Sequence, residues 1–182
     1  MDLLKQKIQE DLKKALKENR EAEVSTLRMT IATISNRETE KRTKIWKEKP
    51  ESSVKELEKE SQLTDEEILE AISSEAKKRK EAILEFEKAM LLLLSRYHSA
   101  FEKGKIEDLV KKEKEELEIL EKYLPEQLSE KEIKKLVKEA IEKVGAKEPK
   151  DIGKAMAELM PQVKGRADGA LVSKIVKESL MK

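Results

Sequence analysis

The sequence contains no cysteine, one histidine, five glycines and four prolines, and only 3% of its 182 residues are aromatic. Without cysteine the chain has no disulfides, no thiolate metal sites and no cysteine nucleophile. A single histidine is too few for a histidine metal cluster. A protein of many β-strands needs more β-branched and aromatic residues than are present. These shortages exclude several classes of enzyme and favour a helical fold.

Long apolar runs are also missing. The longest, Ala89 to Leu94, has six residues, whereas a segment that spans a bilayer needs roughly 18. The N-terminus has no apolar segment of the kind found in signal peptides. We therefore expect a cytoplasmic protein without membrane contacts.

Candidate catalytic groups are scarce. His98 is the lone histidine and lies beside Arg96 and Tyr97, and a lone histidine is much more often a surface or packing residue than a base. The sequence has neither a Gly-rich phosphate loop nor a dinucleotide fingerprint. Neighbouring carboxylates such as Glu66 and Glu67 point in different directions from a helix. We predict no catalytic residue, no metal site and no cofactor.

Charged residues, by contrast, make up 43% of the chain, although its net charge is only +1. Residues 1–50 hold 13 Lys and Arg against 9 Asp and Glu, and residues 131–182 hold 13 against 8. Binding to a polyanion needs a local basic face rather than a basic total. A nucleic acid is therefore expected at the two ends of the chain, and ordinary surface charge is the alternative interpretation.

Apolar residues recur at spacings of three and four along the whole chain, which predicts amphipathic helices. Capping boxes at Thr64–Glu67 and Ser129–Glu132 mark two helix starts. Gly145 suits a left-handed helix end, and Pro149 suits the first turn of the next helix. The expected inner faces are those of Leu4 to Ala15, Val24 to Ile34, Ile68 to Phe86, Val110 to Leu120 (in a helix from about Glu107), Ile133 to Val144, Ile152 to Leu159 and Leu171 to Val176.

The segment Leu124 to Ser129 interrupts this pattern. The residue before Pro125 resists helical angles, and a new helix starts only after Ser129. We predict an all-α protein with an N-terminal domain of long helices, residues 1–124, and a C-terminal domain of three helices, residues 130–182.

The most informative stretch is Met160 to Ser173. We expect Pro161 to end one helix, a turn with Gly165 and Gly169 to follow, and Asp168 to cap the next helix. Glycine at both positions lets another backbone approach closely.

The same turn carries two cations, Lys164 and Arg166. Free backbone N–H groups and cationic side chains beside a helix N-terminus suit an anion such as a phosphate. Most basic turns between helices are only solvated connectors, so that interpretation stays open beside the binding one.

Met160 to Ser173, with Ile175 to Glu178 after it, resembles the end of the YqeY family. It is also similar to the C-terminal tail domain of GatB, the B subunit of the tRNA-dependent amidotransferase. Tyr123 to Ser129 and Ser25 to Met29 resemble YqeY proteins as well. The resemblance covers most of the chain except for two insertions, near residues 45–62 and 90–103.

The resemblance implies a non-catalytic module that binds tRNA or another structured RNA. The tail domain of GatB helps to hold tRNA by its shape and backbone, which requires cations and amides. A family-level association with glutamine-dependent amidotransferase (carbon–nitrogen ligase) activity is also implied. The alternative is a helical adaptor for proteins without nucleic-acid affinity. The residues that match the binding region are Lys164, Gly165, Arg166, Gly169, Lys174 and Lys177.

A second basic cluster, Lys77 to Lys80, is either a further RNA contact or a solvated helix face. The insertion from Met90 to Lys103 has apolar residues every three or four positions, so we expect it to lengthen one helix by about four turns. Its leucines are a candidate surface for a protein partner or for self-association. We expect the two insertions, which contain Trp46 and Phe101, to pack on each other or to form a dimer seam.

Overall fold

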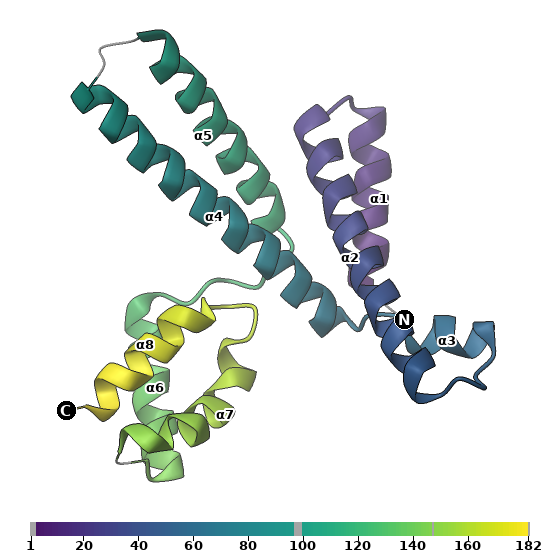
Figure 1. Cartoon of the computed structure of the whole chain (residues 1–182), viewed down its shortest axis with the longest axis vertical. Helices are drawn as coiled ribbons and strands as arrows, with labels where there is room; N and C mark the ends of the chain where they lie inside the picture. Colours follow the sequence, from purple (N-terminus) through teal and green to yellow (C-terminus); the bar gives the residue numbers. More distant parts are fainter. Residues whose placement is uncertain (1–2, 97–99, 147, 182) are drawn as a thin grey trace. The chain divides into compact units, whose positions relative to one another are not determined.

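The computed structural model describes residues 3–96, 100–146 and 148–181, without the side chains of residues 93–96 and 100–102. Within these ranges the chain forms helices joined by turns and no strand (Figure 1), so the predicted all-α class is confirmed. None of the described helices combines the length and apolar character required to cross a bilayer.

The chain divides into two compact units, Met1–Tyr123 and Leu124–Lys182. Helices α1 to α5 belong to the first unit, and α6 to α8 belong to the second. The predicted domains, residues 1–124 and 130–182, stay a prediction.

The first unit begins with a helical hairpin. Helices α1 (Leu3–Lys17) and α2 (Glu21–Glu48) run side by side in Figure 1. Ile8 and Leu27, both fully buried, lie on their inner faces. Asn19 has a positive φ of 52° in the turn between them, a conformation that asparagine tolerates better than most residues.

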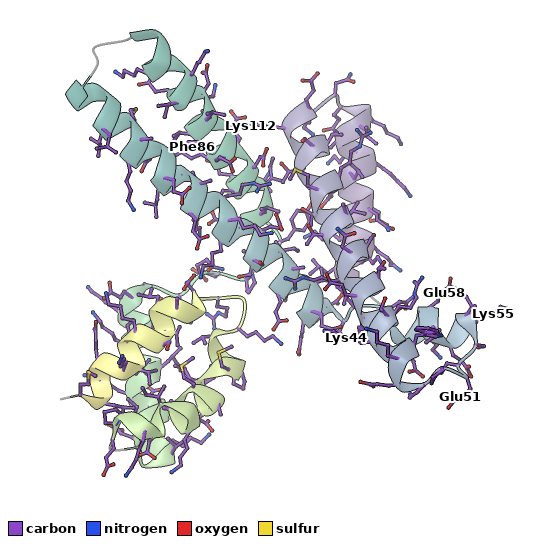
Figure 2. The ribbon with its side chains drawn as sticks, in the orientation of Figure 1. Lys44, Glu51, Lys55, Glu58, Phe86 and Lys112 are labelled. Carbon is purple, nitrogen blue, oxygen red and sulfur yellow. The ribbon has the colours of Figure 1, made fainter. Side chains whose placement is uncertain are left out.

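The hairpin of α4 (Asp65–Arg96) and α5 (Ala100–Glu121) is the longest feature of the first unit. The capping box at Thr64 is confirmed, because Thr64 Oγ1 accepts from Glu67 N at 3.3 Å and the Glu67 carboxylate accepts from Thr64 N at 2.8 Å. Ile72 and Leu120 are buried, and Phe86, labelled in Figure 2, is half-buried on α4.

Two expectations for this hairpin are wrong. Helix α5 starts at Ala100 rather than near Glu107, and residues 90–103 do not lengthen a single helix. Because α4 ends at Arg96 and α5 begins four residues later, the insertion is divided between two helices, and it lengthens α4 by about two turns and α5 by about one. His98 and Tyr97, and the side chain of Phe101, lie outside the described residues.

The other inserted segment contains a short helix, α3 (Val54–Glu60), that the sequence analysis missed. Ser53 caps it and Leu57 is buried, and the helix packs on α2, while Lys55 and Glu58 project outward (Figure 2).

The two insertions therefore do not pack on each other within one chain. Helix α3 leads into the first residue of α4, whereas residue 90 lies 25 residues further along that helix, about 38 Å away at 1.5 Å per residue. Trp46 is 54% exposed on α2. The dimer seam stays a prediction.

The second unit contains α6 (Glu130–Val144), a 3-10 turn η1 (Pro149–Asp151), α7 (Ile152–Val163) and α8 (Gly169–Leu180). Gly145 ends α6 with a φ of 63°, and Ser129 starts it with both bonds of the predicted capping box. All three α-helices contribute to one core, and each fully buried Val or Leu in it stabilises the fold by about 1.5–3 kcal/mol. The core residues are Ile133, Val137, Ala140, Ala146, Ala155, Leu159, Val163, Val172, Ile175, Val176 and Leu180.

Pro161 does not end α7, contrary to expectation. The helix continues to Val163, and Lys164 N still donates to Met160 O at 3.0 Å. Proline has the φ of a helix but lacks the N–H that would bond to Ala157 O, and its ring crowds that carbonyl, so it weakens this turn without ending the helix. The two extra residues bury the Val163 side chain, which is 2% exposed.

Candidate nucleic-acid interface

The turn between α7 and α8 is held by its own backbone. Val163 O accepts hydrogen bonds from Arg166 N at 2.9 Å and from Ala167 N at 3.0 Å. The predicted cap is confirmed, because Asp168 Oδ1 accepts from Ala170 N at 2.7 Å and from Leu171 N at 3.1 Å.

These bonds correct the expectation of free amides at the turn. Four N–H groups that an anion was expected to use are already bound, two by Val163 O and two by the Asp168 carboxylate. The carboxylate occupies the place at the start of α8 where a helix N-terminus attracts anions. We call the turn between α7 and α8, with the segment packed on it (residues 124–129), the corner of the second unit. Any attraction for phosphate at this corner must therefore come mainly from side chains.

The interdomain segment, residues 124–129, is bonded to the same turn. Leu128 N donates to Arg166 O at 2.7 Å, and Gln127 Nε2 donates to Gly165 O at 2.9 Å. In the other direction, Arg166 Nε donates to Glu126 O at 3.3 Å. Two segments that carry the resemblance, 38 to 40 residues apart in sequence, thus meet in space.

The backbone conformation at position 165 requires glycine. Its φ is +73°, a left-handed conformation that favours glycine. A Cβ at this position lies 3.8 Å from Pro125 Cγ, which is ordinary contact, so the backbone angle rather than crowding requires glycine. At Gly169 nothing lies within 4 Å of an added Cβ.

Arg166 is half-buried and lies near the Glu132 carboxylate. Hydrogen bonds from Ser129 hold the pKa of the Glu132 carboxyl below its usual value, and the charge of Arg166 lowers it further. With its Nε on Glu126 O, the guanidinium joins the turn to residues 126–132. Its position is that of a supporting residue.

The lysines of the predicted site have a different environment. Lys164, Lys174 and Lys177 are all exposed. Lys174 and Lys177 are three residues apart on α8, on the side opposite the buried Val172 and Val176. Lys174 Nζ lies 4.0 Å from Glu178 Oε1 with 73% of its side chain exposed, and an exposed pair of that kind interacts weakly.

The other basic cluster, residues 77–80, is tied into ion pairs within the first unit. Arg79 Nε lies 2.7 Å from Glu116 Oε2 and 3.3 Å from Glu113 Oε2, with only 12% of the arginine side chain exposed. Lys78 pairs with Glu75 and Lys80 with Glu121. The Arg79 and Lys80 pairs join α4 to α5, whereas the Lys78 pair lies within α4. Only Arg79 is a packing residue, because the side chains of Lys78 and Lys80 are 61% and 48% exposed.

Sequence reasoning missed Glu126 and Gln127 as part of the corner. Proline at position 125 marked the segment as a break between helices, but nothing in the local pattern indicated what its backbone would contact. Within the described ranges, no group of three or more His, Asp or Glu residues is arranged to hold a metal ion.

The family model described as Yqey-like protein matches residues 5–91 and 96–180. The break at 92–95 falls within the insertion at residues 90–103, whereas the match runs through residues 45–62. No curated protein matches the chain.

Proposed function

The chain belongs to the YqeY family, and we propose that it is a non-catalytic helical module that binds tRNA or another structured RNA, as the tail domain of GatB does. The observation that carries the proposal is the exposure of Lys164, Lys174 and Lys177 around the end of α7 and the outer side of α8. Exposed lysine side chains suit phosphate oxygens, whose contacts position an RNA without reading its bases.

The six residues of the proposed site have three kinds of role. The three lysines contact phosphates. Gly165 and Arg166 hold the turn against residues 124–129 and so fix where Lys164 lies. Gly169 starts α8 beside the Asp168 cap. Recognition of this kind depends on RNA shape, which agrees with the low aromatic content of the chain, because base-stacking platforms are what single-strand binders need.

The test is tRNA binding by the full-length protein with Lys164, Lys174 and Lys177 changed together to Gln. Each phosphate that a lysine neutralises adds about 0.9 to the slope of log K against log salt for a duplex. The triple variant is expected to bind more weakly at low salt, with a slope smaller by about 2 to 3. Unfolding of the variant by urea is measured in parallel and is expected to match wild type.

A matched control removes three other exposed lysines of the same unit. Lys135 and Lys138 on α6 and Lys150 in η1 are exposed, and their replacement by Gln changes the net charge equally. The control is expected to bind tRNA more tightly than the site variant. Equal loss in the two variants points to nonspecific charge and refutes the assigned site.

One observation favours the second candidate, a helical adaptor. Leu84, Leu91 and Leu92 on α4 are 55%, 66% and 64% exposed, and exposed apolar residues in a cluster mark protein contacts. A groove of about 370 Å³ between α4 and α5, with Met90 and Val110 among its lining residues, lies in the same hairpin. A protein partner or a second copy bound at residues 90–103, with no salt-dependent RNA binding, supports the adaptor instead.

We propose no reaction for this chain. Association with a glutamine-dependent amidotransferase, a carbon–nitrogen ligase, follows only from the likeness to the GatB tail. In that setting the chain contributes RNA binding, and the catalytic chemistry belongs to other subunits.

A further inference from the structure

One side of the α4–α5 hairpin combines a groove with exposed leucines. The groove has a volume of about 370 Å³, and half-buried Met90 and buried Val110 are among the residues that line it. Leu84 and Leu91 are 55% and 66% exposed. Both lie beside the groove, because they stand three and four residues from Glu87, another lining residue, and residues at that spacing are neighbours on one side of a helix. We call this surface the groove side of the hairpin.

The charged groups of the groove side are mostly paired with one another. Glu87 Oε1 lies 3.2 Å from Lys114 Nζ, and Lys80 Nζ lies 2.9 Å from Glu121 Oε1. Two further pairs lie within α5. A phosphate chain would meet carboxylates along the whole of this surface, so the groove side does not suit RNA. By helical spacing its charged residues are Lys80, Lys88, Lys103, Lys111 and Lys114, with Glu81, Glu87, Glu107, Glu115, Glu118 and Glu121.

The two ion pairs between the helices also show which of their residues lie side by side. Helices α4 and α5 run in opposite directions (Figure 1), and Lys80 pairs with Glu121 as Glu87 pairs with Lys114. Seven residues forward along α4 therefore correspond to seven residues back along α5. The point midway between Leu84 and Leu91 lies level with the surroundings of Lys114.

We propose that the groove side binds the groove side of a second copy of this chain, with the two α4 helices antiparallel and the two hairpins forming one bundle of four helices. A two-fold axis midway between Leu84 and Leu91 places Leu84 of each copy against Leu91 of the other. It also places Glu87 of each copy beside Lys88 of the other. The two grooves then face each other across the axis, and their apolar lining is covered.

The distribution of charge and shape selects a second copy as the occupant. In the antiparallel arrangement Lys111 of each copy lies near Glu115 and Glu118 of the other, whereas parallel helices would bring Glu87 against Glu87, and like charges at close range repel. A surface that binds itself about a two-fold axis must carry both the projecting groups and the hollow that receives them. The groove side carries both, since exposed leucines border the groove.

The groove side is small, so the dimer is weak. From residue 80 to residue 92 it is about 18 Å long at 1.5 Å per residue, and two helices make it about 20 Å wide. It is therefore smaller than a standard interface, which buries about 800 Å² per partner. We expect a dissociation constant on the order of 0.1 mM. This association does not depend on RNA binding, and it goes beyond the proposed function.

The first experiment is sedimentation equilibrium of the full-length protein from about 10 µM to about 1 mM, a range that spans the expected dissociation constant. The site variant is Leu84→Glu with Leu91→Glu, which places four carboxylates in the middle of the dimer and is expected to raise the dissociation constant at least about tenfold. The matched control is Leu3→Glu with Leu16→Glu, two exposed leucines of α1. It is expected to stay within about twofold of wild type, and circular dichroism checks that both variants are folded.

The second experiment tests the orientation by cross-linking and uses the absence of cysteine from the chain. Leu84→Cys and Leu91→Cys are made as separate single variants and oxidised with copper phenanthroline, each alone and mixed in equal amounts. A disulfide requires Cα atoms within about 7 Å. In the antiparallel dimer two copies of the same position are displaced along the helix by about 10 Å, so the mixture is expected to cross-link and each variant alone is not.

The outcomes also separate this inference from the proposed function. A wild-type protein that stays monomeric at about 1 mM overturns the dimer, and so do equal losses in the site variant and the control, or cross-linking of the single variants in preference to the mixture. Salt-dependent tRNA binding by such a monomer leaves the proposed function standing. A dimer that dissociates and cross-links as expected but binds no tRNA supports the inference and refutes the proposed function.

Discussion

Substitution of Gly165 by Ala tests whether this glycine serves the fold or the approach of RNA. Its φ of +73° is the left-handed conformation, which costs an L-residue with a Cβ about 1–2 kcal/mol. The added methyl group meets Pro125 only at ordinary contact distance, so crowding adds little. We therefore expect the Ala variant to lose about 1–2 kcal/mol of unfolding free energy, measured by urea titration of the full-length protein.

Gly169→Ala is the matched control. Gly169 is the first residue of α8, and an added Cβ has nothing within 4 Å. Alanine is the better helix former, so this variant is expected to gain up to about 1 kcal/mol. The reasoning is refuted if both glycines respond alike, or if Gly165→Ala unfolds at the same urea concentration as wild type.

Three further predictions concern charge. Changing Arg79 to Met leaves the buried Glu116 carboxylate without its partner and is expected to cost about 3–5 kcal/mol of unfolding free energy. The control, Lys80→Met, removes an exposed pair and is expected to cost at most about 1 kcal/mol. Equal urea midpoints for the two variants contradict this. The Lys41 side chain and the Thr64 backbone N–H lower the pKa of Glu67, so this group stabilises the fold above pH 4.5 and loses that contribution as pH falls through the lowered value. Lys41→Met removes the largest cause and is expected to flatten that fall in unfolding free energy, and an unchanged pH profile counts against it. Asp168→Ser keeps an N-cap and removes a negative charge beside the lysines. We therefore expect tRNA affinity to rise severalfold at low salt. Unchanged or weaker affinity argues against the corner as a binding site.

The helix caps could be predicted from sequence because each depends on neighbouring residues. Thr64 and Glu67, Ser129 and Glu132, and the Asp168 cap are bonded within three residues. The buried faces of the helices could be predicted in the same way, from apolar residues spaced three and four positions apart. Helix α3 was missed because seven residues are too few to show periodicity, although Ser53 and Glu56 form the same capping box that marked the other helices.

The candidate site was predictable only in part. The exposed lysines could be predicted from composition and motif, because their positions depend only on two short neighbouring helices, α7 and α8, whose residue spacing is visible in the sequence. The hydrogen bonds of the turn with residues 124–129 could not be predicted, because their partners lie 38 to 40 positions apart in sequence. No local pattern indicates such a contact. The sequence suggested Gly165 and Arg166 as ligands, which stays a prediction, but it did not indicate that both also bond the turn to residues 126 and 127.

The most direct test of the central claim is the salt dependence of tRNA binding by the full-length protein, compared with the variant that lacks Lys164, Lys174 and Lys177. The account predicts that log K falls linearly with log salt in wild type and that the slope is smaller by about 2 to 3 in the variant. Identical slopes for the two proteins, or no measurable tRNA binding at low salt, contradict it.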